Sequence, residues 1–160
     1  MTIIRDLRLV GSTVSGVLVG FLFTVMWSHS HYATAYAAPA TRVFSGDAGL
    51  VLNFIKPDKA ADFEATVSKL RDALKTSTKP DRQDQAKSWK IFRAKEPGAD
   101  GSVLYVFMID PAVKDADYTV ASILSEAYPD TVQEMYKQFA AAYASGQNFV
   151  NLTLVAALGE

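Results

Sequence analysis

The sequence contains no cysteine, and its only two histidines, His29 and His31, lie near the amino terminus. Without cysteine the chain has no disulfide, no thiolate nucleophile and no cysteine-ligated zinc or iron–sulfur site. An excess of one charge is also missing, because 16 basic residues stand against 17 acidic ones. A surface that binds nucleic acid needs a basic excess, so this balance argues against nucleic acid as a partner. Dinucleotide and phosphate loops, a nucleophile elbow and metal-ligand spacings are absent too, so we expect no cofactor and no metal.

The amino-terminal segment has the pattern of an export signal. Arg5 and Arg8 precede an uncharged run, Leu9–Trp27, and a small-x-small site ends at Ala37. We therefore predict a signal peptide over residues 1–37, with the protein exported to the periplasm or secreted. The alternative is an uncleaved membrane anchor over residues 9–27, because this run approaches the ~20 residues that span a bilayer. After cleavage the protein has neither histidine nor cysteine.

Residues 38–48 read as a linker and residues 49–160 as one folded domain. Strands are predicted over Leu50–Lys56, Trp89–Lys95, Val103–Ile109 and Asn148–Leu158. Helices are predicted from an Asp58 cap through Leu74, from Asp117 or Thr119 to Ala127, and from an Asp130 cap to Ser145-Gly146. The polar stretch Lys75–Ser88 is predicted to be a long loop, with at most one helical turn after Pro80.

The stretch Val103–Ile109 is apolar on both faces of its predicted strand. Val103, Tyr105, Phe107 and Ile109 point to one side, and Leu104, Val106 and Met108 to the other. Exposure of either apolar face to water is unfavourable, so we expect an interior strand that is covered on both sides.

The order strand, helix, strand, strand, helix, strand predicts an α+β domain of the ferredoxin-like βαββαβ kind, a four-stranded antiparallel sheet with helices on one face. Right-handed crossovers place the first and third strands in the middle. Two helices cover one face only, so we predict a homodimer in which a second copy covers the other. The loop Lys75–Ser88 is the rival cover, and it has no large apolar residues.

The segment Leu50–Leu74 resembles the start of antibiotic-biosynthesis-monooxygenase-like domains, which are dimeric α+β barrels. The resemblance lies in the strand that runs into Ile55-Lys56-Pro57-Asp58-Lys59 and then Ala61-Asp62-Phe63-Glu64. It implies a dimeric barrel, and functions that range from cofactor-free oxygenation, haem chemistry and isomerisation to small-ligand sensing. The exported domain lacks the histidine that would act as base or haem ligand, and no catalytic residue can be matched by position.

Asn53, Asn151 and Thr153 are the polar residues on neighbouring strands that we expect to meet on one face. If this is the face away from the helices, they would join Trp89, Tyr105 or Phe107 in a mostly apolar pocket of the kind that binds small ligands. The alternative is that the polar groups bond one another across strands or across the dimer interface. Asp110, before Pro111, is the best-placed acid, and a turn-forming role is the simpler interpretation.

Two hypotheses follow. The first is an exported dimeric domain that binds a small hydrophobic ligand or a partner protein and is not an enzyme. The second is a cofactor-free monooxygenase or isomerase that acts in a barrel cavity with Asn, Tyr and Asp groups.

Overall fold

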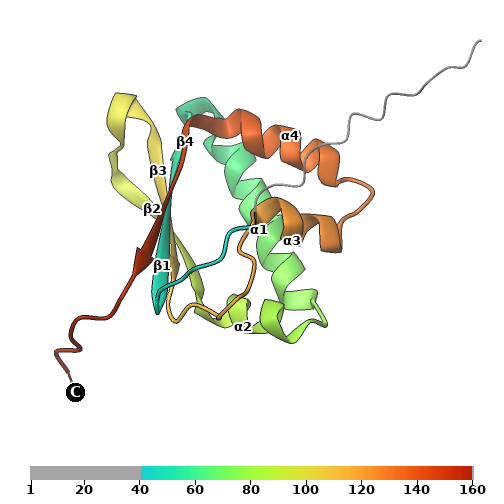
Figure 1. Cartoon of the computed structure of the whole chain (residues 1–160). Coiled ribbons are helices and arrows are strands. Elements are labelled where there is room, and N and C mark those ends of the chain that lie inside the picture. Colours follow the sequence, from blue (N-terminus) through green and yellow to red (C-terminus); the bar gives the residue numbers. More distant parts are fainter. Residues whose placement is uncertain (1–40, 160) are drawn as a thin grey trace, which may run out of the picture. The chain divides into compact units, whose positions relative to one another are not determined.

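The computed structural model describes residues 41–159, so the export segment predicted over 1–37 lies outside the described residues. The elements in order are β1 (Ala48–Ile55), a short 3-10 helix (Pro57–Lys59), α1 (Ala60–Thr76), α2 (Pro80–Ser88), β2 (Trp89–Pro97), β3 (Val103–Ile109), α3 (Val120–Ala127), α4 (Val132–Ala142) and β4 (Tyr143–Leu152) (Figure 1). No helix in this part of the chain is long and apolar enough to cross a membrane.

The four strands form one antiparallel sheet in the order β2-β3-β1-β4, and the helices lie on one of its faces (Figure 1). The predicted α+β class with a four-stranded antiparallel sheet is confirmed. Burial alternates along β1, because every second side chain faces the helices. Val51, Asn53 and Ile55 are buried, while the residues between them are only half-buried.

The core lies between the sheet and the helices. Phe63 of α1 is fully buried, and its ring centroid lies 4.8 Å from that of Tyr105, 6.0 Å from Phe107 and 5.5 Å from Phe139. Burial of one such side chain contributes about 2 kcal/mol to folding. The stripe predicted on the first helix therefore packs against the apolar side of β3 that contains Tyr105 and Phe107.

The second face of the sheet is open. Within the described residues no helix or loop lies over it (Figure 1), so the expectation that β3 is covered on both sides is met on one side only within a single chain. The open face is formed by aliphatic and aromatic residues in cross-strand register, which are Leu50, Leu52, Phe54, Phe92, Leu104, Val106 and Met108. Phe92 is 51% exposed and the others are half-buried.

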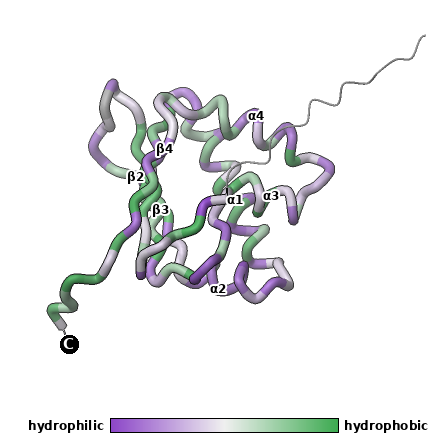
Figure 2. Tube along the Cα trace, viewed as in Figure 1, coloured by the Kyte–Doolittle hydropathy of each residue, from purple (hydrophilic) through white to green (hydrophobic). Residues whose placement is uncertain are grey.

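The polar segment predicted as a loop over Lys75–Ser88 is mostly helical, and this prediction was wrong. Helix α1 continues to Thr76, and α2 begins at Pro80, a residue suited to the first helical position. Figure 2 shows that α2 is largely hydrophilic. It therefore has no apolar stripe from which a helix could be predicted in the sequence. Hydrogen bonds from Arg82 to Glu126 and from Gln85 to the Asp117 carbonyl attach it to the domain, on the helix side of the sheet.

Several predicted boundaries also differ. Lys59 and Thr131 occupy the N-cap positions expected for Asp58 and Asp130, and neither makes a side-chain capping bond. Helix α4 ends at Ala142 rather than at Ser145-Gly146, and the chain passes directly into β4. The last strand thus begins five residues earlier than predicted and ends at Leu152, so it is displaced toward the amino terminus relative to the prediction.

Candidate functional site

The segment 41–47, predicted as part of a linker, is packed on the domain. Phe44 is 4% exposed, with its ring stacked on Phe149 at 4.1 Å and edge-on to Tyr118 at 5.0 Å. The backbone N–H of Arg42 donates to Asp117 Oδ1 and Thr119 Oγ1, each at 3.1 Å, and its carbonyl accepts from the Tyr118 N–H at 2.7 Å. Residues 41–47 form neither helix nor strand, as expected for a linker, but these contacts fix the backbone of Arg42 beside α3.

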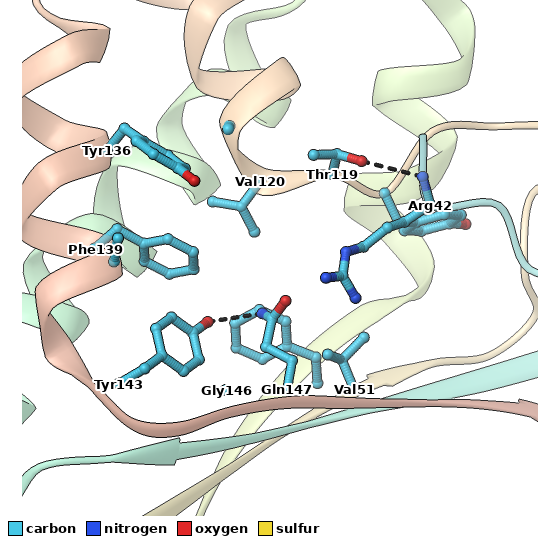
Figure 3. Close-up of a pocket in the computed structure, with 13 residues that line it drawn as sticks. Arg42, Val51, Thr119, Val120, Tyr136, Phe139, Tyr143, Gly146 and Gln147 are labelled. Atoms are coloured by element: carbon cyan, nitrogen blue, oxygen red, sulfur yellow. Dashed lines mark hydrogen bonds between the residues drawn. The ribbon is translucent and has the colours of Figure 1, made fainter. Parts of the chain in front are cut away.

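A cavity of about 340 Å³ lies between this segment, the helices α3 and α4, and the sheet (Figure 3). Aromatic side chains form much of its wall, and they are Phe107, Tyr118, Tyr136, Phe139 and Tyr143. Arg42, Thr119 and Gln147 supply polar groups. An apolar cavity with a few converging polar groups is the usual composition of a small-molecule site.

The floor of the cavity rests on a buried hydrogen-bond network centred on Asn53. The Asn53 amide donates to the carbonyls of Val51 at 3.0 Å and Tyr105 at 3.2 Å. Its Oδ1 accepts from the Tyr143 hydroxyl at 2.9 Å and from Gln147 Nε2 at 2.7 Å. Gln147 Nε2 also lies 2.7 Å from the Tyr143 hydroxyl oxygen. All four hydrogen-bonding positions of the fully buried Asn53 are therefore satisfied.

Burial raises the pKa of Tyr143 well above its usual value, although the Gln147 hydrogen bond and the nearby Arg42 charge oppose this rise. Its hydroxyl consequently stays protonated at any physiological pH and serves as a hydrogen-bond donor. Asp117 differs. Burial favours its neutral form, but bonds from Thr119, the Arg42 backbone and Ser122 outweigh burial and hold its pKa below the usual value. Asp117 therefore remains a charged acceptor that holds Arg42 and Thr119 together.

Two of the six predicted site residues belong to this site. Asn53 supports the floor and Phe107 lines the wall. They lie on the helix-covered face of the sheet, so the condition that these residues lie on the face away from the helices is not met. The cross-strand register explains this position, because it places Val51, Asn53 and Ile55 on the same side of the sheet as Tyr105 and Phe107.

The other four predicted residues lie elsewhere. Tyr105 is buried, and its hydroxyl donates to Glu64. Burial is the largest cause, and this hydrogen bond the next, of a rise in the pKa of Tyr105 to about 12. Trp89 lines a separate cavity of about 190 Å³ against α1. Asn151 is exposed and its Oδ1 accepts from the Ser45 N–H at 2.8 Å. Thr153 follows the end of β4 and is exposed, so Asn53, Asn151 and Thr153 do not meet.

Arg42, Tyr143 and Gln147 line the cavity but were not predicted as site residues from the sequence. Gln147, rather than Asn151, pairs with Asn53 across β1 and β4. The two-residue alternation of β4 extends back through Phe149 and Gln147, and this pattern would have placed Gln147 on the face of Asn53. Ser145-Gly146 obscured it, because this pair is typical of a helix end.

Comparison with family models, curated proteins and solved structures finds no match to this chain. Among the described residues no group of three or more His, Asp or Glu side chains is arranged to hold a metal ion.

Proposed function

We propose that this chain is a small-molecule-binding domain whose ligand occupies the cavity between α3, α4 and the sheet. The observation that supports this is the combination of about 340 Å³ of space, an aromatic wall and a polar floor that is already hydrogen-bonded before any ligand enters. Ligand sites are usually largely pre-formed in this way, and the volume is at the small end of their range of roughly 300–1,000 Å³.

Binding fits the cavity better than base catalysis. The described residues that line it include no carboxylate, and the raised pKa of Tyr143 removes its hydroxyl as a base at neutral pH. The Tyr143 hydroxyl and the Gln147 amide instead hold a fixed floor under the space that a ligand would fill.

Blocking the cavity tests this proposal. Ala140 on α4 lines the cavity and is exposed, so Ala140→Trp should place an indole in the space without disturbing the core. Ala141→Trp is the matched control, because Ala141 is also exposed and does not line the cavity. Native mass spectrometry of the protein purified from its source should show a bound small molecule in the wild type and in Ala141→Trp, and none in Ala140→Trp. A ligand-free wild type, or a ligand retained by Ala140→Trp, would contradict the proposal.

We also propose that the domain is ferredoxin-like and that two copies form a dimeric α+β barrel by covering each other's open sheet face. Support comes from the element order, in which each helix of the βαββαβ pattern is replaced by two, and from the apolar rows on the open face. Export across a membrane remains a proposal supported by the sequence pattern of residues 1–37 alone.

A further inference from the structure

We propose that the ligand of this cavity is a small organic anion, a carboxylate on a flat apolar body, and that Arg42 binds the carboxylate. This inference rests on the proposed function and names the ligand class of the same site. It follows from the charge, the electrostatic surroundings and the shape of the cavity.

Arg42 is the only charged residue among the described residues that line the cavity. Three of the four arginines in residues 41–159 pair with a carboxylate, Arg71 with Asp72, Arg82 with Glu126 and Arg93 with Glu64. Arg42 is the exception. Its guanidinium takes part in none of the ion pairs of this region and lies over the Phe149 ring, 5.9 Å from the centroid.

The surroundings of Arg42 also favour an anion. Figure 3 shows its side chain directed into the space above Val51 and Gln147, from a backbone fixed by Asp117 and Thr119. Asp117 lies beside this site, but its Oδ1 already accepts from the N–H groups of Arg42 and Thr119. Val120 and Ala121, at the amino-terminal end of α3, line the cavity as well, and the first turn of α3 contains no acidic residue. The amino-terminal end of a helix adds partial positive charge.

The wall opposite this charge selects the rest of the ligand. Phe139 and Tyr143 lie edge to face, with ring centroids 5.2 Å apart, and Phe107 and Val120 complete an apolar surface. Aromatic walls of this kind favour a flat apolar body, which gains stacking and edge-to-face contacts in addition to area burial. A single guanidinium matches the two oxygens of one carboxylate by paired hydrogen bonds.

A pair of probes that differ in charge alone tests the inference. Naphthoate and its neutral amide, naphthamide, are titrated calorimetrically into the full chain. We expect naphthoate to bind the wild type about tenfold to a hundredfold more tightly than naphthamide does. This is the difference in affinity that hydrogen bonds to a charged group usually contribute. Arg42→Gln should lose this preference and keep its affinity for naphthamide. Lys87→Gln is the control, since it removes the same charge from an exposed site on α2, and it should bind both probes as the wild type does.

Three results would overturn the inference. They are equal affinity of the wild type for both probes, an unchanged preference in Arg42→Gln, and a wild type that binds neither probe. The Ala140→Trp experiment on the natural ligand decides separately whether the cavity binds a small molecule, so the ligand class can fail while the proposed function stands. Circular dichroism of Arg42→Gln establishes that the variant is folded.

Discussion

Asn53 is the residue on which the polar part of the site depends. Its side chain is fully buried, and it joins three strands, because it bonds the carbonyls of β1 and β3 and accepts from two side chains of β4. A buried amide is stable only when its groups are paired, and here each pairing also fixes a neighbour. The orientations of Tyr143 and Gln147 in the cavity therefore follow from a residue that does not line it.

Replacing this amide should be costly. Asn53→Ala leaves the Tyr143 hydroxyl and Gln147 Nε2 without their shared acceptor and removes the donor to two carbonyls, so we expect a loss of about 3 kcal/mol in the free energy of unfolding. Urea denaturation measures the loss. Gln138→Ala, at an exposed position of α4, is the control and should change stability by less than about 0.5 kcal/mol. Equal stability of the two variants would show that the network contributes little.

Helix α2 is the element that the sequence pattern concealed. It contains no large apolar residue, and its attachment depends on Arg82, whose side chain is 8% exposed. Arg82 donates to both carboxylate oxygens of Glu126 on α3, at 3.2 and 2.9 Å, and to Gln85 Oε1 at 2.8 Å. The Arg82 hydrogen bond is the largest cause that lowers the pKa of Glu126, with burial opposing it. A buried arginine thus replaces the apolar stripe that usually attaches a helix.

The chain offers a matched pair of cations to test this attachment. Lys79 also contacts Glu126, at 3.2 Å, but its side chain is 61% exposed. Arg82→Met should cost about 2 kcal/mol and speed amide hydrogen exchange in α2, because it breaks a buried pair. Lys79→Met should cost less than about 0.5 kcal/mol, as is usual for surface ion pairs. Equal effects of the two changes, or an unaltered exchange rate in Pro80–Ser88, would contradict this account.

At the scale of the whole molecule, residues 41–159 leave two apolar surfaces without a cover from their own helices and loops. The first is the open sheet face, where Val106 lies between Leu52 and Phe92 in cross-strand register. The second is the tail after β4, which leaves the sheet on the side away from the helices (Figure 1) and in which Val155 is 98% exposed. Exposed apolar surfaces of this kind mark interaction sites, and the proposed dimer would cover the sheet face.

Sedimentation velocity tests the proposed dimer. The wild type should sediment with twice the mass of one chain. Phe92→Glu should sediment as a monomer, because it places a charge in the interface, and the fold should tolerate it since Phe92 is half-exposed in the single chain. Ala65→Glu adds the same charge to the exposed side of α1 and should leave the dimer intact. A monomeric wild type, or a Phe92→Glu variant that remains dimeric, would refute this interface.

The class of the fold and most of the strands could be predicted from the order of the residues. Alternation and apolar runs depend only on near neighbours, so β1, β2, β3 and the stripe of α1 are visible in the linear pattern. Tertiary structure alone decided the site. The partly buried position of Arg42 beside α3, the salt bridge that attaches α2 and the pairing of Gln147 with Asn53 all arise from residues far apart in sequence. Polar groups of this kind are stabilised by the partners that the fold brings to them, and no local periodicity reports such partners.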